Sequence, residues 1–170
     1  MSFSPVPVYS FREITDISPE FLIKIGVEFL MLDLDNTIAA YSESAPSDSV
    51  AHWVTLIKKH GIELFIVSNS KRKVRVDEFA QALGIRFIKR ASKPSPEGVK
   101  RAMAATGHSA DKSALVGDQV YTDTLAANRA GVVSIIVKPR RFTNPFLALR
   151  YAFETPFRAI SKNKMWKVHI

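Results

Sequence analysis

The sequence predicts an α/β fold built on a mainly parallel sheet of five strands. Short apolar runs rich in β-branched residues alternate with segments of helical periodicity, which is the pattern of successive βα units. With 170 residues, 46% of them hydrophobic and 24% charged, the chain has the size and composition of an ordinary globular domain. We therefore expect a single domain over residues 1–170.

The expected elements follow one another in regular order. A short helix should begin at Ser18-Pro19 and end at Gly26, because serine caps a helix and proline fits its first turn. Strands are expected over 27–33, 62–67, 85–88, 113–116 and 132–137, and the helices between them over 50–59, 71–83, 95–106 and 122–130. Residues 138–170 lie outside this alternation.

Composition limits the chemistry that the chain can carry. The absence of cysteine removes thiol nucleophiles, disulfides and cysteine-ligated metals, and the four histidines are scattered without ligand spacing. Any metal must therefore be bound by oxygen. No apolar run approaches the roughly 20 residues that span a bilayer, and the N-terminal residues do not have the pattern of a secretion signal. We expect a cytoplasmic protein.

Polar residues follow four of the expected strands at the point where each strand ends. They are Asp33, Asp35 and Thr37, then Ser68 and Asn69, then Lys93, and then Gly117 and Asp118 with Asp123 beyond them. In an open parallel sheet, ligands bind outside the carboxyl ends of the strands, so these residues should meet in one cleft. Asp33 and Asp35 should project in the same direction, because residues two apart on an extended chain share a face.

The acidic residues at this edge predict a magnesium site. The carboxylates of Asp33, Asp35 and Asp118 would repel one another without a cation, and Mg²⁺ favours a few carboxylates together with water and phosphate oxygens. A carboxylate can also attack phosphorus, while a second carboxyl group protonates the leaving alcohol and then activates water. Lys93 could offset the phosphoryl charge, and Ser68 could hold phosphoryl oxygens. No glycine-rich phosphate loop is present, which disfavours a nucleotide site of that kind.

These residues resemble the four motifs of the haloacid dehalogenase (HAD) superfamily phosphatases, in the same order along the chain. The resemblance implies a three-layer Rossmann-like catalytic core over residues 27–137 and hydrolysis through an aspartyl-phosphate intermediate with Mg²⁺. It implies the following roles: Asp33 as nucleophile, Asp35 as general acid and base, Ser68, Asn69 and Lys93 as phosphate ligands, Asp33, Asp35 and Asp118 as metal ligands, and Thr37, Gly117 and Asp123 in support.

The spacing of the motifs leaves no room for the cap domain that many superfamily members insert between them. An uncapped site would admit large substrates such as lipid head groups. The chain more closely resembles the YqeG-like branch of subclass IIIA, which is similar to phosphatidylglycerophosphate phosphatases. The resemblance lies in the segments 32–37, 67–70, 93–94, 116–119, 122–123 and 138–139. That resemblance implies phosphatidylglycerophosphate as a candidate substrate.

The C-terminal extension, residues 138–170, carries most of the net charge of +8. It holds eight basic residues and a single acid, Glu154, which indicates an acidic partner or an anionic surface. A helix should begin at Asn144-Pro145, and Pro156 should end or kink it near Glu154. It would carry an apolar stripe of Phe146, Leu149, Phe153 and Phe157 and a polar stripe of Arg150, Glu154 and Arg158.

Two interpretations of the extension stay open. Packing of its apolar stripe on the core is favoured, and peripheral attachment to an anionic membrane surface is the alternative. Nucleic acid is not expected as a partner, because no recognised binding motif is present. The basic run over 71–75 is expected to be an exposed helix face, and an anion-binding patch is the alternative.

A non-enzymatic function is the alternative to a phosphatase. A phospho-accepting receiver also combines acids, a hydroxyl residue and Lys-Pro, but its Lys-Pro comes last, whereas Asp118 here follows Lys93-Pro94. A HAD-fold phospho-accepting or interaction module with little turnover would keep every motif residue. The favoured hypothesis is an Mg²⁺-dependent phosphatase of phosphomonoesters.

Overall fold

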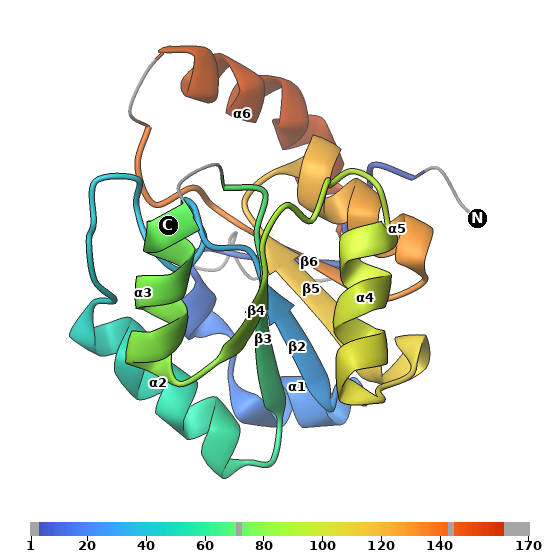
Figure 1. Ribbon diagram of the computed structural model, residues 1–170. Coiled ribbons are helices and arrows are strands. Elements are labelled where there is room, and N and C mark those ends of the chain that lie inside the picture. Colours follow the sequence, from blue (N-terminus) through green and yellow to red (C-terminus); the bar gives the residue numbers. More distant parts are fainter. Residues whose placement is uncertain (1–3, 71–72, 143–144, 162–170) are drawn as a thin grey trace.

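A six-stranded parallel sheet forms the centre of the computed structural model, which describes residues 4–70, 73–142 and 145–161 (Figure 1). The strand order is β1-β6-β5-β2-β3-β4, and each strand pairs with its neighbour in parallel. The strands are β1 (Tyr9–Phe11), β2 (Phe29–Leu32), β3 (Glu63–Val67), β4 (Arg86–Ile88), β5 (Ser113–Gly117) and β6 (Val133–Val137).

Helices cover both faces of the sheet. They are α1 (Pro19–Lys24), α2 (Asp48–Lys59), α3 (Lys73–Leu83), α4 (Glu97–Thr106), α5 (Leu125–Ala130) and α6 (Pro145–Ala159). Short 3-10 turns lie at Ile14–Asp16 and Ala110–Lys112, and a π-helical turn, Val120–Thr124, leads into α5. α1, α2 and α3 pack on one face, and α4 and α5 pack on the other.

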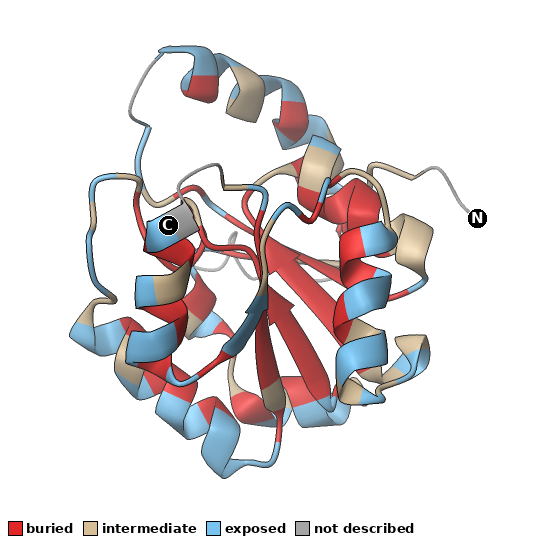
Figure 2. Ribbon diagram, in the orientation of Figure 1, coloured by how far each residue is buried: buried red, intermediate tan, exposed pale blue. Residues whose placement is uncertain are grey.

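The side chains of β2 point alternately to the two faces of the sheet, and this explains the three-layer arrangement. Leu30 and Leu32 belong to the apolar core under α1, α2 and α3, whereas Phe29 and Met31 belong to the core under α4 and α5. Successive side chains of a strand point to opposite faces, so a strand covered on both sides is apolar throughout. Figure 2 accordingly shows the central strands buried and the outer sides of the helices exposed.

The predicted α/β fold is confirmed, but the predicted number of five strands is wrong. The sixth strand, β1, is only three residues long and has no periodicity that a sequence pattern could reveal. Its place depends on pairing with β6, where Tyr9 lies opposite Ile135. Between β2 and β4 the described residues form only α2, β3, α3 and their loops, so no cap domain interrupts this part of the chain.

Helix α6 lies across the carboxyl edge of the sheet (Figure 1). Its polar side faces inward, because Arg150 contacts Asp118 and Arg158 donates to the Val137 carbonyl oxygen. The favoured interpretation, in which the apolar stripe packs on the core, is therefore wrong: Phe146, Leu149 and Phe153 are 71, 56 and 65% exposed. Glu154 and Arg158 are buried instead. Arg158 donates to the Val137 carbonyl oxygen at the end of β6, and Glu154 pairs with Arg158.

The predicted start of α6 falls partly outside the described residues, because Asn144 is not among them; the helix begins at Pro145. An end near Glu154 is wrong, since the helix continues past Pro156 to Ala159, and the alternative of a kink there stays a prediction. Arg158 donates to Glu154 one turn earlier, and this bond spans Pro156. Among the described helices, none combines the length and the apolar character that crossing a membrane requires.

Candidate active site

Asp33 lies at the carboxyl end of β2, where the strand passes into a tight turn. Its backbone N–H donates to the Val116 carbonyl oxygen (2.8 Å), so Asp33 is held by the neighbouring strand β5. Asn36 has a φ of +62° in the turn that follows, a conformation that asparagine tolerates better than most residues. The Thr37 hydroxyl reaches back to Asp33 Oδ2 at 3.4 Å. The predicted Asp33 and Thr37 therefore lie together.

Lys93 is a buried cation between two carboxylates. Its Nζ lies 2.5 Å from Asp33 Oδ1 and 2.6 Å from Asp123 Oδ1, and all three side chains are almost completely buried. Burial by itself disfavours the charged amine, but the two carboxylates together raise the pKa of Lys93 above its usual value. Lys93 is therefore positively charged where the sequence predicts a phosphate-binding cation.

Asn69 holds the backbone of Lys93. Its Oδ1 accepts from the Lys93 N–H (2.9 Å), and its Nδ2 donates to the Lys93 carbonyl oxygen (2.8 Å). Ser68, next to it, is buried at the end of β3, and its hydroxyl oxygen accepts from the Ser70 N–H (3.0 Å). These contacts bring Ser68 and Asn69 to the same edge as Lys93, and they give Asn69 a positioning contact that the sequence pattern did not indicate.

Asp33, Asp118 and Asp123 form an acidic cluster, in which one carboxylate oxygen of each lies within 4.8 Å of the others. Asp118 is fully buried at the end of β5, and its Oδ1 has no hydrogen-bond partner among the described residues. Both Asp123 oxygens are engaged, since Oδ1 lies beside Lys93 and Oδ2 accepts from the Gln119 N–H (3.0 Å).

Burial and mutual repulsion make this cluster costly to ionise. Burial is the largest cause that raises the pKa of Asp33, to about 7, and it also raises the pKa of Asp118 well above its usual value. Neighbouring carboxylates add to both shifts, whereas Lys93 lowers the pKa of Asp33. A cation bound by these oxygens would relieve the repulsion.

Gly117 allows Asp123 to approach the cluster. A Cβ atom at Gly117 would lie 2.2 Å from Asp123 Cγ, so no larger residue fits unless Asp123 moves. The π-helical turn holds Asp123 in place, because its N–H donates to the Gln119 carbonyl oxygen (2.9 Å). The predicted supporting residues Gly117 and Asp123 are thus in direct steric contact.

Asp35 lies outside the acidic cluster and beside Arg75 of α3. Arg75 Nε is 3.1 Å from Asp35 Oδ1, and the same guanidinium donates to the Ala40 carbonyl oxygen (2.6 Å) and lies over the Phe79 ring. The expectation that 71–75 is an exposed face is therefore wrong for Arg75, which is buried, while residues 71–72 lie outside the described ranges. Sequence reasoning missed Arg75 because its partner is 40 residues away.

Helix α6 adds a second missed residue, Arg150. Its guanidinium lies 3.4 Å from Asp118 Oδ2 and 3.7 Å from Glu154, and Arg158 of the same helix donates to the Asp118 and Val137 carbonyl oxygens. The spacing of four residues from Arg150 to Glu154 to Arg158 is the signal that sequence carries for this inward polar face.

The donor set of the cluster fits a hard divalent cation. Asp33 and Asp118 are buried carboxylates, and Asp118 Oδ1 is a buried acceptor that lacks a hydrogen-bond partner in the described part of the chain. Mg²⁺ takes oxygen ligands of this kind. Asp123 is close enough to contribute, although both its oxygens already have partners.

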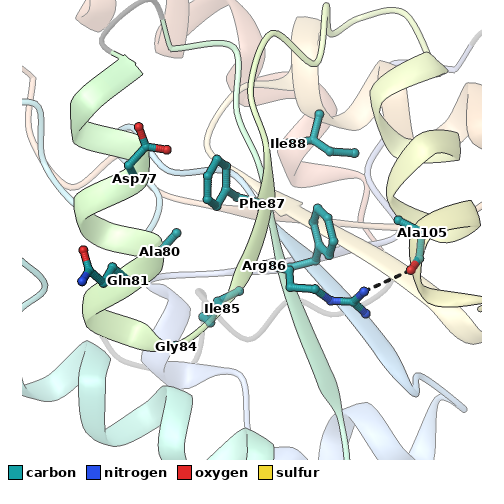
Figure 3. A pocket seen from close by; sticks show the side chains of 10 residues that line it. Asp77, Ala80, Gln81, Gly84, Ile85, Arg86, Phe87, Ile88 and Ala105 are labelled. Carbon is teal, nitrogen blue, oxygen red and sulfur yellow. Dashed lines mark hydrogen bonds between the residues drawn. The ribbon is translucent and has the colours of Figure 1, made fainter.

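A separate pocket lies at the outer edge of the sheet, between α3, β4 and α4 (Figure 3). Its volume is about 650 Å³, and its lining includes Phe65, Ala80, Phe87 and Ile88. None of the predicted site residues lines it, so this pocket is distinct from the acidic cluster.

Comparison with protein families identifies the family of this chain. A family model of haloacid dehalogenase-like hydrolases matches residues 10–131, a range that includes every predicted site residue. The chain belongs to the haloacid dehalogenase-like hydrolases. This confirms the predicted superfamily and the prediction of an enzyme of the HAD phosphatase type.

Relatives of this HAD-like hydrolase agree with that assignment. The chain is 33% identical over 159 residues to the probable phosphatase YqeG of Bacillus subtilis (strain 168), and the match covers 94% of this chain and 91% of the relative. The similarity to the YqeG branch is thus confirmed, whereas the similarity to phosphatidylglycerophosphate phosphatases stays a prediction.

Solved structures share the HAD fold at low sequence identity. A putative subfamily IIIA hydrolase from Legionella pneumophila superposes with a TM-score of 0.53 at 19% identity, over 77% of this chain and 74% of that chain. The 3-deoxy-D-manno-octulosonate 8-phosphate phosphatase of Moraxella catarrhalis, solved with magnesium, phosphate and sugar, gives 0.51 at 17% identity, over 82 and 92%. These similarities concern the fold.

Proposed function

We propose that the protein is an Mg²⁺-dependent phosphomonoesterase that works through an aspartyl-phosphate on Asp33. The observation that carries this proposal is the ion pair between Asp33 and Lys93 beside Asp118 Oδ1, which has no hydrogen-bond partner among the residues that the structure describes. A buried nucleophile, a fixed cation and a buried carboxylate oxygen at one edge of the sheet suit the transfer of an anionic group.

The proposed reaction has two steps, and Asp35 gives a proton in the first and takes one in the second. An oxygen of the Asp33 carboxylate attacks phosphorus, the bond from phosphorus to the substrate oxygen breaks, and protonated Asp35 gives its proton to the departing alcohol. Asp35 then takes a proton from water, which attacks the phosphorus and releases inorganic phosphate, so that Asp33 is restored. Lys93 holds positive charge beside Asp33 throughout, and Arg75 keeps the Asp35 carboxylate oriented.

Asp33 and Asp118 would hold the Mg²⁺ ion, and the predicted contribution of Asp35 stays a prediction because its carboxylate pairs with Arg75. Bound Mg²⁺ supplies positive charge that offsets the charge of the phosphoryl group. Ser68 and Lys93 are proposed to bind the phosphate, and Asn69 to position the Lys93 backbone.

The candidate substrate is a phosphomonoester on a lipid head group, with phosphatidylglycerophosphate as the specific candidate. Similarity to the YqeG branch and the lack of a cap domain between β2 and β4 support this choice. We propose that residues 27–137 form the catalytic core of a single domain, and that residues 138–170 form an extension that serves it.

The direct test is release of phosphate from p-nitrophenyl phosphate and from lipid phosphomonoesters, with Mg²⁺ and with EDTA. We expect turnover only with the metal. Incorporation of a phosphoryl group without turnover would favour the alternative, a phospho-accepting module. No incorporation and no turnover on any phosphomonoester would contradict the proposal.

The metal site predicts unequal effects of two neighbouring acids. Asp118→Asn should abolish the stabilisation of the protein by Mg²⁺, whereas Asp123→Asn should weaken Mg²⁺ binding by about 10-fold to 100-fold, as is typical of residues that act beside a ligand. The measurement is the melting temperature over a Mg²⁺ titration, since a ligand that binds only the folded state raises it. Asp111→Asn, an exposed acid, is the control. Equal, negligible effects at both sites would remove the metal from the mechanism.

The proposed role of Asp35 in proton transfer predicts a burst of nitrophenol release for the variant Asp35→Asn. kcat should fall by about 10²-fold to 10⁴-fold, the usual contribution of general acid–base catalysis. With p-nitrophenyl phosphate, whose leaving group needs little protonation, the first turnover should remain and the phosphoenzyme should accumulate. Stopped-flow absorbance would show about one nitrophenol per chain before the slow phase. Arg75→Met, which leaves Asp35 in place without its partner, should have the same effect to a smaller degree. Wild-type steady-state kinetics for Asp35→Asn would refute this role.

A further inference from the structure

The outer face of α6 is an exposed apolar surface next to the acidic cluster. Phe146, Leu149 and Phe153 are 71, 56 and 65% exposed, and Ile160, directly after the helix, is 65% exposed. We call these four residues the outer stripe. Their spacing of three, four and seven residues places them on one side of the helix. Exposed apolar patches of this kind mark contact sites with proteins or membranes.

The polar side of α6 prevents the outer stripe from turning inward. Arg150 contacts Asp118, and Arg158 donates to Glu154 and to the Val137 carbonyl oxygen, both at 2.9 Å. Rolling the helix over would leave the buried carboxylate of Asp118 without Arg150 and the Val137 carbonyl oxygen without Arg158, which is costly in a low-dielectric interior. In the part of the chain that the structure describes, the outer stripe therefore stays exposed and is available to a partner.

Charge around the outer stripe favours an anionic partner. Lys138 and Arg141, just before the helix, are exposed, and Phe142 beside them packs on Tyr151 of α6 with ring centroids 5.3 Å apart. Glu154, the one acid in the sequence from 138 to 170, is buried and paired with arginine. Three more lysines, Lys162, Lys164 and Lys167, follow in the sequence. A second copy of the chain would bring like charges together, which disfavours a dimer through this face.

We propose that the outer stripe docks on an anionic lipid bilayer. A helix that presents phenylalanine and leucine on one side, with basic residues nearby, lies in the plane of the interface and buries its apolar side there. Lysine and arginine side chains near an anionic leaflet strengthen this attachment. α6 has 15 residues and a length of about 22 Å, so it can lie along the bilayer surface but cannot cross it.

Docking in this way would place the bilayer beside the reaction centre. The inner side of α6 touches Asp118 while its outer side would face lipid, so one helix thickness separates the membrane from the acidic cluster. This consequence rests on the proposed function, and it makes a phosphomonoester in the head-group layer the natural substrate.

The test is co-sedimentation of the full-length protein with vesicles of phosphatidylcholine alone, and with vesicles of equal parts phosphatidylcholine and phosphatidylglycerol. Wild type should bind the anionic vesicles, and binding should weaken at high salt because surface charges are then screened. The triple variant Phe146→Gln, Leu149→Gln, Phe153→Gln should bind at least about tenfold more weakly. The matched control replaces Ile23, Leu56 and Val74, exposed apolar residues of α1, α2 and α3, by glutamine and should bind like wild type.

Turnover of soluble p-nitrophenyl phosphate separates the two proposals. Unchanged turnover in the triple variant shows that it is folded, and vesicle binding by a wild type without phosphatase activity would overturn the reaction and leave the docking intact. Equal binding to neutral and anionic vesicles would overturn the docking. So would wild-type vesicle binding by the triple variant, or self-association in size-exclusion chromatography that the triple substitution abolishes without any vesicle binding.

The double variant Lys138→Gln, Arg141→Gln, which leaves the stripe intact, should retain binding but with a shallower salt dependence.

Discussion

Asp33→Asn is expected to lower kcat for p-nitrophenyl phosphate by about 10⁴-fold or more, since removal of a covalent nucleophile is among the largest losses that a single substitution causes. The amide nearly matches the carboxylate in size but cannot form the acyl phosphate. Lys93 keeps its contact with Asp123 in the variant, so the fold should survive. Steady-state release of nitrophenol and the mass of the acid-quenched protein are the two measurements.

The same loss of a carboxylate at an exposed site provides the control for Asp33→Asn. Asp111, in the 3-10 turn before β5, is exposed, and Asp111→Asn should keep wild-type turnover and phosphoryl incorporation. The Asp33 variant should gain no phosphoryl mass. Turnover by Asp33→Asn at the wild-type rate, or a phosphoryl group on another residue, would contradict the assignment of the nucleophile.

Lys93→Met should lose both activity and stability. The substitution removes the cation that touches Asp33 and Asp123 and leaves buried carboxylates uncompensated, and removal of one partner from a buried ion pair costs about 3–5 kcal/mol. Turnover should fall by about 10²-fold or more, because the fixed charge that stabilises the phosphoryl group is gone. Urea unfolding in EDTA, together with p-nitrophenyl phosphate kinetics, measures both losses.

The stability loss of Lys93→Met should depend on pH in a defined direction. Burial and neighbouring carboxylates raise the pKa of Asp33 to about 7 even with Lys93 present, and removal of the cation raises it further. Below this pKa Asp33 is protonated and needs no partner, so the difference in unfolding free energy from wild type should be smaller at pH 5 than at pH 8. Lys89→Met, at a partly exposed lysine that pairs with the half-exposed Asp77, is the control and should cost about 1 kcal/mol or less. A deficit that grows toward acid pH would contradict this account.

The layered fold and the carboxyl-edge constellation follow from local sequence patterns. Apolar runs such as Phe29–Leu32 are buried on both faces only in a parallel sheet under helices, and the order of the strands along the chain then brings Asp33, Ser68, Lys93 and Asp118 to one edge. Strand β1 escaped prediction because three residues carry no period, and only pairing with β6 defines it.

The tertiary structure decides which residues that lie far apart in the sequence become partners. Asp35 and Asp123 carry the same carboxylate group but have different partners. Asp35 pairs with Arg75 of α3. Asp123 contacts Lys93 beside Asp33, because Gly117 leaves room for its side chain. No local pattern contains these distances, since each depends on how helices dock on the sheet.

Helix α6 shows most clearly which of its properties the sequence determines and which the tertiary structure decides. Its sequence determines an amphipathic helix with an apolar stripe and a polar stripe, but either side of such a helix can face a protein. The hydrophobic effect alone would turn Phe146, Leu149 and Phe153 inward. The tertiary structure places Arg150, Glu154 and Arg158 inward instead, because the fully buried carboxylate of Asp118 and the strand-end carbonyl oxygens lie beneath the helix. A buried charge without a partner costs more than an exposed apolar side chain, and that difference sets the orientation of α6.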